Sequence, residues 1–287
     1  MRHQRSGVPM CEIEDPVFSH AAAVVREAYR RYHDASLIHP DPLEIVLRYT
    51  RARDREVVAL ICASLALGRV QSILDVCNAV LVRLPNPAED LKEASLSDLR
   101  DRYEGFVYRF FGREEISHFL FAVGEVLRRR GSLEAAFLSH LSPSHETVLP
   151  ALCGLSRELS DHAGGIHGLL LSQVERGSAA KRWHLFLRWL VRADSVDPGG
   201  WSGVSSSRLV VPMDTHMHRI CRRLGILKRK SADGKAALEV TRFFRLLDSE
   251  DPVRFDFSLT RMGIHPDTAR ESKALWNGET DAFSIQT

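Results

Sequence analysis

A lysine and an aspartate, each placed where a helix is expected to begin, are the residues of this sequence best suited to covalent chemistry. Lys181 opens an amphipathic segment, and Asp214 follows the extended apolar run Val210 to Met213. An amine can attack an electron-poor carbon, and a fixed carboxylate can stabilise the positive charge that develops there. Because a free lysine has a pKa near 10.4, a nucleophilic amine at neutral pH needs surroundings that disfavour its ammonium by about 4 kcal/mol.

The helix that carries Lys181 is expected to begin at Ser178. Its polar residues recur at helical spacing and predict a cationic stripe on an otherwise buried helix: Lys181, His184, Arg188 and Arg192. With Ser178 as the N-cap, Lys181 is the third helical residue. There the positive end of the helix dipole and the neighbouring Arg182 both disfavour a second cation. The plainer interpretation is that Lys181 is only the first residue of a solvated basic face.

Asp214 has the position of a helix N-cap, after Pro212 and before Thr215. An ordinary capping role is the simplest interpretation of that position. A metal-dependent hydrolase that uses Asp214, His216 and His218 is an alternative. However, side chains two residues apart on a helix point about 200° apart and cannot share one metal ion.

No other part of the sequence predicts a metal or a cofactor, and we expect neither. The five cysteines, Cys11, Cys62, Cys77, Cys153 and Cys221, are odd in number and widely spaced. Such spacing argues against a disulfide framework and for a reducing compartment.

The overall charge of +2 does not by itself indicate nucleic-acid binding. A phosphate-binding face would have to come from local clustering of cations. The candidates are Arg182, Arg188, Arg192, Arg219, Arg222 and the run Lys228 to Lys230. Such a run is more often a solvated surface, but Gly177 and the expected helix start beside it are suited to bind an anion through backbone N–H groups.

The two segments resemble the helix-hairpin-helix-GPD superfamily of DNA glycosylases, in which Gly-x-Gly-x-Lys opens one helix and Val-Asp-Thr-His-x-x-Arg follows. They look closest to an uncharacterised bacterial branch that carries Gly-Ser-Ala-x-Lys-Arg, Phe-Leu-Arg-Trp-x-Val-Arg and Pro-x-Asp-Thr-His. The likeness is strongest from Gly177 to Gly263. Two departures stand out: Ala179 replaces the second glycine, and an insertion from Asp194 to Leu209 lengthens the gap before Asp214.

The resemblance implies a DNA repair glycosylase that flips a damaged base out of the duplex, with lyase activity through a Schiff base on Lys181. Asp214 would stabilise the charge on the sugar. The implied DNA-binding residues are Gly177, Ser178, Arg182, Arg188, Arg192, His216 and Arg219, and Trp201 and Tyr108 are weaker candidates for the base pocket. No cysteine follows Cys221, so the iron-sulfur cluster of several relatives is not expected. A DNA-structure-binding protein that kept the fold without catalysis is the alternative.

The periodicity predicts roughly ten helices and no alternating β pattern, which indicates an all-α protein. The expected helices are Ala21–Tyr32, Val57–Leu67, Val70–Leu84, Leu96–Arg102, Glu114–Arg130, Val148–Leu159, Lys181–Arg192, Ser231–Leu247 and Pro252–Met262. A buried strand is the alternative for residues 57–67. Pro85 and Pro87 predict a loop before the candidate capping residue Ser95.

From the resemblance we expect two helical lobes with the active cleft between them. The middle lobe would be residues 50–211, and the second lobe residues 18–49 together with 212–287, after a flexible tail at residues 1–17. The longest apolar stretch is far shorter than the ~20 residues of a membrane span, and the first ten residues lack the apolar core of a signal peptide. We therefore expect a cytoplasmic monomer whose partner is DNA and not a membrane.

Overall fold

The computed structural model describes residues 16–164, 170, 174 and 177–264, and every regular element among them is a helix. Pairing of the β type is limited there to three isolated bridges, one of which joins Ser178 to Asp233. The all-α prediction is therefore confirmed. The predicted N-terminal tail lies almost entirely outside the described residues, and the first helix already begins at Pro16.

The helices follow one another along the chain, and the longest fully described connection is residues 192–214, between α10 and α11. In chain order the α-helices are α1 (Pro16–Tyr32), α2 (Leu43–Val46), α3 (Ala52–Leu65), α4 (Val70–Leu81), α5 (Pro87–Glu93), α6 (Leu96–Arg102), α7 (Arg113–Arg130), α8 (Leu133–Ser139), α9 (Leu149–His162), α10 (Lys181–Val191), α11 (Thr215–Arg223), α12 (Gly234–Leu247) and α13 (Phe255–Ile264). Short 3-10 turns occur at η2 (Ala35–Leu37), η4 (Ser206–Arg208) and η5 (Pro252–Arg254).

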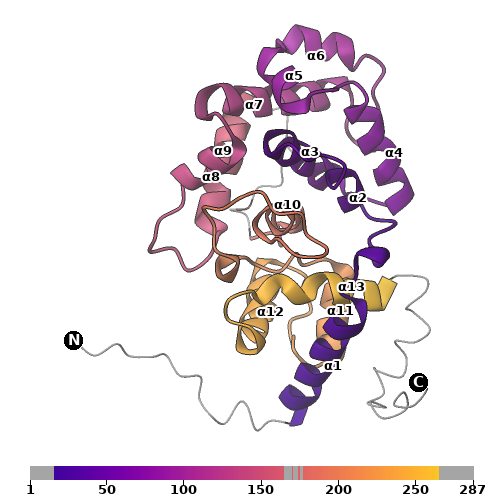
Figure 1. Cartoon of the computed structure of the whole chain (residues 1–287), viewed down its shortest axis with the longest axis vertical. Helices are drawn as coiled ribbons and strands as arrows, with labels where there is room; N and C mark the ends of the chain where they lie inside the picture. The colour runs from indigo at the N-terminus through magenta and orange to yellow at the C-terminus, as the bar shows by residue number, and fades with distance from the viewer. Residues whose placement is uncertain (1–15, 165–169, 171–173, 175–176, 265–287) are drawn as a thin grey trace.

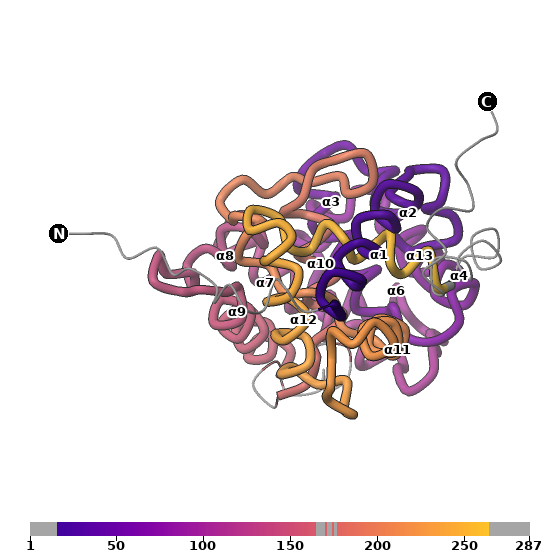
Figure 2. Tube along the Cα trace, turned by 90° about the horizontal axis from the view of Figure 1, so that it is seen from below, coloured from indigo at the N-terminus to yellow at the C-terminus, as the bar shows by residue number. Residues whose placement is uncertain are grey.

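Helix α10 lies between two groups of helices (Figure 1). Helices α3 to α9 are above it, and α1 with α11 to α13 below it, in the view of that figure. The view from below again places α10 inside the bundle (Figure 2). Helix α3 packs on α10, and α13 packs on both α1 and α11. Elements from both groups can therefore reach α10, whereas a division into two lobes with a cleft stays a prediction.

Helix α3 is buried on nearly every side, and its central residues are almost fully inaccessible. This confirms the helical interpretation over the strand alternative for residues 57–65, and the helix ends two residues before the expected Leu67. Two of its polar residues are buried as well, Asp54 and Glu56. Asp54 accepts a hydrogen bond from the backbone N–H of Ala88, 3.0 Å away, in the first turn of α5. The sequence predicts a loop at Pro87, which instead occupies the first position of α5, where the missing N–H of proline costs nothing.

Glu56 contacts the start of a second helix, α8. Its carboxylate accepts hydrogen bonds from the backbone N–H groups of Leu133 and Glu134, each at 3.1 Å, at the start of α8. It also accepts the indole N–H of Trp201 at 3.0 Å. Burial raises the pKa of Glu56, although these donors oppose the shift. One carboxylate thus joins α3, the start of α8 and the loop after α10.

Replacing Glu56 by alanine is expected to lower the free energy of unfolding by about 3 kcal/mol, because the indole N–H of Trp201 and two N–H groups in the first turn of α8 lose their buried acceptor. Urea denaturation measures this difference. The exposed Glu93 on α5 provides the control, and its change to alanine is expected to alter stability by less than about 0.5 kcal/mol. Equal stabilities of the two variants would contradict the bridging role of Glu56.

No helix in the described part of the chain combines the length and the apolar character that crossing a membrane requires.

Candidate active site

Lys181 and Asp214 form a direct ion pair. The Nζ atom of Lys181 lies 2.9 Å from Oδ2 of Asp214. Lys181 is the first residue of α10 and Asp214 is the N-cap of α11, so the pair joins the starts of two helices. The Lys181 side chain is 38% exposed and that of Asp214 is 18% exposed, which leaves the amine accessible beside a more buried carboxylate.

The predicted N-cap role of Asp214 is confirmed. Its Oδ1 atom accepts the backbone N–H groups of His216 at 2.9 Å and Met217 at 2.8 Å, and its backbone is extended. The preceding strand-like run is buried, and the N–H of Val211 donates to Oγ1 of Thr241 on α12. One carboxylate oxygen is therefore held by the helix start, and the other faces Lys181.

The charge state of Asp214 follows from these contacts. Burial alone would raise its pKa, but the positive charge of Lys181 and the N–H of Met217 outweigh burial, and the net pKa is lowered. Asp214 is therefore ionised throughout the neutral range. A carboxylate that stays charged is suited to stabilise a developing cation, and less suited to hold a proton.

The expected N-cap of α10, Ser178, is wrong by two residues. Ala180 is the N-cap, in the left-handed conformation with φ 44° and ψ 34°, and Lys181 is the first helical residue instead of the third. Ser178 is engaged one turn earlier, where its Oγ accepts the N–H of Ala180 at 3.3 Å and its backbone bridges to Asp233. The positive end of the α10 dipole therefore lies directly at Lys181.

Gly177 and Ser178 lie against the start of α12 and not in an isolated hairpin. The N–H of Gly234 donates to the carbonyl of Gly177 at 3.0 Å, and a Cβ on Gly234 would lie 3.0 Å from the carbonyl oxygen of Ser178. Glycine at 234 therefore permits this close approach. Asp233, the N-cap of α12, binds Arg229 at 2.6 Å. The starts of α10 and α12 are thus joined by backbone contacts, and the start of α11 is joined to α10 by the ion pair.

Arg182 is half-buried and is held by the end of α3. Its Nη1 donates to the carbonyl oxygen of Ser64 at 2.7 Å, and burial lowers its pKa. Arg182 thus anchors α10 to α3, and its phosphate contact stays a prediction. This anchor fixes the residue next to Lys181.

Arg188 is also not on a phosphate-binding face, because it is only 4% exposed. Its Nε donates to Asp197 at 3.1 Å, and its Nη1 to Asp256 on α13 at 2.5 Å. Burial raises the pKa of Asp256 to about 6, even though Arg188 opposes the shift. The predicted DNA contact of Arg188 is wrong, and the residue instead fastens α10 to α13.

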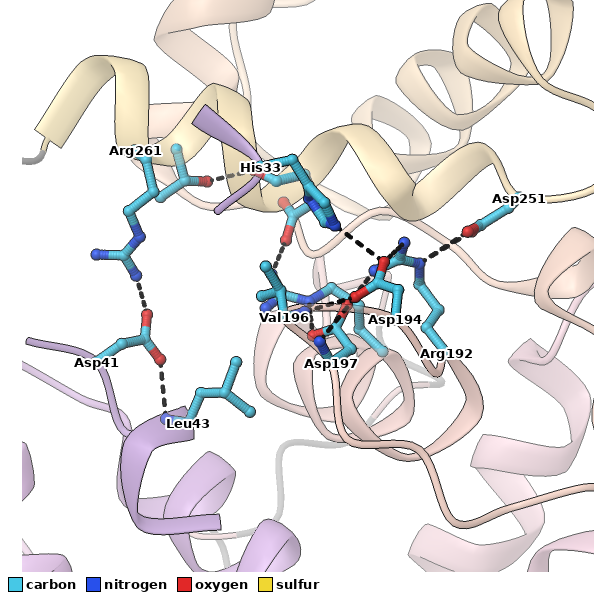
Figure 3. A network of polar contacts seen from close by, with 12 residues as sticks. His33, Asp41, Leu43, Arg192, Asp194, Val196, Asp197, Asp251 and Arg261 are labelled. Carbon is cyan, nitrogen blue, oxygen red and sulfur yellow. Dashed lines mark hydrogen bonds and ion pairs between the residues drawn. The ribbon is translucent and has the colours of Figure 1, made fainter. Parts of the chain in front are cut away.

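Arg192 is 3% exposed and lies among three carboxylates (Figure 3). It donates to Asp251 at 3.0 Å, to Asp194 at 2.6 Å and to Asp197. Its predicted phosphate contact is wrong for the same reason, since its charge is already neutralised inside the protein. Nε2 of His33, which follows α1, lies 2.9 Å from the same oxygen of Asp194, Oδ2, that Arg192 contacts. Asp194 and Asp197 come from the predicted insertion, which thus supplies counterions to α10.

Trp201 and Tyr108 are both engaged in the fold. Trp201 is 6% exposed, and its ring packs against Phe137 and Phe186 with centroids 5.4 and 5.3 Å away. Stacking of Trp201 on a flipped base is therefore excluded in this conformation, which corrects that prediction. The hydroxyl of Tyr108 donates to the carbonyl of Leu67 at 2.7 Å, just beyond α3.

The cations that do reach solvent follow Asp214 along the chain. Arg219, Arg222, Lys228 and Lys230 are exposed, and these four residues are called the basic surface below. Nη2 of Arg219 lies 3.5 Å from Nδ1 of the half-buried His216. The basic surface thus begins about one turn of α11 from the ion pair.

The histidines of α11 are not arranged as a metal site. Nε2 of His218 bonds the carbonyl of Arg229 at 3.1 Å, while His216 faces Arg219. Among the described residues, no group of three His, Cys, Asp or Glu side chains could hold a metal ion.

A family model described as a protein of unknown function, DUF2400, matches residues 41–265, well over half of the chain. The chain belongs to the DUF2400 family. The matched region contains Lys181, Asp214 and every helix from α2 to α13. No curated protein and no solved structure shows a significant match to this DUF2400 chain. The family description assigns no activity.

Sequence reasoning missed three residues that shape this site of the DUF2400 chain. Gly234 permits the close approach of α12, Asp256 binds Arg188, and Ser64 supplies the carbonyl that holds Arg182. The capping pattern at Asp233 was a usable signal for the start of α12. The contacts of Asp256 and Ser64 depend on tertiary packing, for which the local sequence carries no signal.

Proposed function

We propose that this DUF2400 protein is a DNA glycosylase with lyase activity, in which Lys181 is the nucleophile and Asp214 stabilises the charge on the sugar. The observation that carries the proposal is the 2.9 Å contact between a partly exposed lysine amine and a carboxylate held by the start of α11. The likeness of both motifs to the helix-hairpin-helix-GPD superfamily supports the same assignment, and the substrate base is left open.

In the proposed reaction, the ammonium of Lys181 first gives one proton to water, and the neutral amine, oriented by Asp214, then attacks C1′. The N–C1′ bond forms while the glycosidic bond breaks, and the base leaves with that electron pair and takes one proton from the attacking nitrogen. The nitrogen then loses its second proton, the ring opens, and O4′ keeps the C1′–O4′ electrons and takes a proton. A C1′=N Schiff base results. Loss of a proton from C2′ then expels the 3′ phosphate, which is the lyase reaction.

The carboxylate of Asp214 acts while C1′ is positively charged. Its lowered pKa keeps it ionised, and its second oxygen is fixed by two backbone N–H groups. A charge placed in advance costs no reorganisation when the cation forms. This role does not require Asp214 to hold a proton between turnovers.

The test is reductive trapping on a duplex that contains an abasic site, which requires no recognition of a base. The amine condenses with the abasic aldehyde, water leaves, and borohydride donates a hydride to C1′, which leaves a stable covalent product. We expect the wild-type protein to give this product. A protein that binds DNA but never traps would instead be a non-catalytic DNA-structure-binding protein.

Binding to DNA is expected to depend steeply on salt despite the overall charge of only +2. If the four cations of the basic surface each contact a phosphate, the plot of log K against log salt has a slope of about −3.6, at −0.9 per contact. Changing Arg219 and Arg222 to alanine should reduce the magnitude of the slope by about 1.8. Fluorescence anisotropy over a salt series measures it. Arg129 on α7 is also exposed, and Arg129→Ala is the control that should leave the slope unchanged. Equal slopes for the wild type and all variants would refute the proposal that the basic surface contacts phosphates.

A further inference from the structure

A tight turn between α6 and α7 presents two large apolar side chains to solvent. Val107 is 79% exposed and Phe110 is 71% exposed, and these two residues are called the apolar tip below. Single exposed apolar residues are common on protein surfaces. Two large apolar side chains that are both more than two-thirds exposed, within four residues of each other, instead indicate a surface that binds a partner. The residues that flank them, Phe106 and Phe111, are buried and anchor the turn in the core.

The turn is held in a strained shape. The N–H of Tyr108 donates to the carbonyl of Phe111 at 2.8 Å, and that of Phe111 donates back at 2.9 Å. Between them Arg109 has a φ of 56°, in the left-handed region that disfavours residues with a Cβ. Strain of this kind persists where the surroundings enforce it and is common at functional sites. Here the enforcing contact is the end of α3.

The apolar tip and the residue next to Lys181 are both held by the last residues of α3 and the loop directly after it. The carbonyl of Leu67 accepts from the Tyr108 hydroxyl at 2.7 Å and from Arg109 at 3.4 Å. Gly68 makes room for this arrangement, because a Cβ there would lie 2.3 Å from Nη1 of Arg109. Ser64, three residues earlier, holds Arg182, the neighbour of Lys181. The tip is therefore fixed in position relative to the nucleophile.

The charges beside the tip indicate what it contacts. The guanidinium of Arg109 lies 5.9 Å from the centroid of the Phe110 ring, and Arg69, next to Gly68, is exposed. An aromatic ring with cations beside it matches a nucleic acid, in which bases offer flat apolar faces between phosphates. A protein partner would need a contact area far larger than two side chains supply.

We propose that the apolar tip inserts into the base stack of duplex DNA next to the nucleotide that Lys181 attacks, while Arg109 contacts the backbone. This inference rests on the proposed function, since it gives the same site its means of opening the duplex. Apolar side chains inserted between bases unstack them and kink the duplex.

The experiment compares Phe110→Ala and Val107→Ala with Val82→Ala, a control residue 76% exposed at the end of α4. Binding is measured on an abasic duplex that carries 2-aminopurine opposite or beside the lesion. The fluorescence of 2-aminopurine rises when this base is unstacked. Phe110→Ala is expected to weaken binding about tenfold and to remove the fluorescence rise. The salt slope should stay unchanged because no charge is removed. Phe110→Trp is expected to retain both signals, and Val82→Ala to behave as wild type.

The outcomes separate this inference from the proposed function. Wild-type trapping together with wild-type affinity and fluorescence in Phe110→Ala would overturn the inference and leave the proposed function intact. An equal loss in Val82→Ala would also overturn it, because the loss would then not be specific to the tip. A wild-type protein that binds neither intact nor abasic duplex would overturn both.

Discussion

Replacing Lys181 by glutamine is expected to abolish reductive trapping on abasic DNA. Only an amine can form the Schiff base that borohydride reduces, so the loss should be complete at any enzyme concentration. DNA affinity should change by no more than a few fold, because the basic surface keeps its four cations. Denaturing gel electrophoresis of the covalent product measures trapping, and anisotropy on the same duplex measures binding.

Lys92→Gln on α5 is the matched control for Lys181→Gln, since it removes the same charge and functional group from a lysine of similar exposure, 37% against 38%, that is also ion-paired and lies outside the basic surface. Exposed lysines or a terminal amine can give weak trapping on a reactive abasic aldehyde. The decisive quantity is therefore the yield of Lys181→Gln relative to Lys92→Gln. Equal yields would remove Lys181 from the reaction, whatever the protein does with DNA.

Replacing Asp214 by asparagine is expected to slow trapping by roughly 10² to 10³, which corresponds to the 3 to 4 kcal/mol that one preorganised group contributes. Asparagine keeps an oxygen that can accept the N–H groups of His216 and Met217, so the cap of α11 and the fold should survive. What is lost is the negative charge 2.9 Å from the amine. Single-turnover rates of product formation measure the effect.

Thermal melting of Asp214→Asn is the accompanying measurement. A melting temperature close to that of the wild type, together with slow trapping, assigns the effect to charge and not to unfolding. A variant that traps as fast as the wild type would show that Asp214 is only a helix cap. DNA affinity should be unchanged or slightly higher, because a negative charge near the phosphates is removed.

The parts of this fold that could be predicted from the sequence are those with local causes. Asp214 caps α11, Ser95 forms a capping box at α6, and Gly131 ends α7 in the left-handed conformation before Ser132 caps α8. Each of these signals acts within about four residues of itself. Local hydrogen bonds are therefore sufficient to set where these helices begin and end, without any tertiary contact.

The candidate site was predicted only in its two central residues, Lys181 and Asp214. Helical spacing places Arg188 and Arg192 on the polar side of α10. It does not reveal that four carboxylates cover these arginines, those of Asp194, Asp197, Asp251 and Asp256. A charged side chain is exposed by default because burial costs several kcal/mol unless a counterion is present. Asp194 and Asp197 lie in an irregular loop after α10. Asp251 and Asp256 lie about 60 residues further along the chain, just before and within α13.

Ser178 shows a different limit of local reasoning. A serine after glycine is a good capping residue, and the sequence around it predicts a helix start there. In the structure the same residue bridges to Asp233, and the chain needs two further residues, including the left-handed Ala180, before α10 begins. A long-range backbone contact thus displaces a local preference.

The counterions that residues 194–197 supply to α10 also limit how this chain can vary. Deleting that loop would leave Arg188 with one carboxylate and Arg192 with Asp251 alone, inside a protein core. Removing one partner of a buried ion pair costs about 3 to 5 kcal/mol, comparable to much of the total stability of a folded domain. The loop and the two arginines must therefore be gained or lost together, and anyone who transplants α10 into another scaffold has to move residues 194–197 with it.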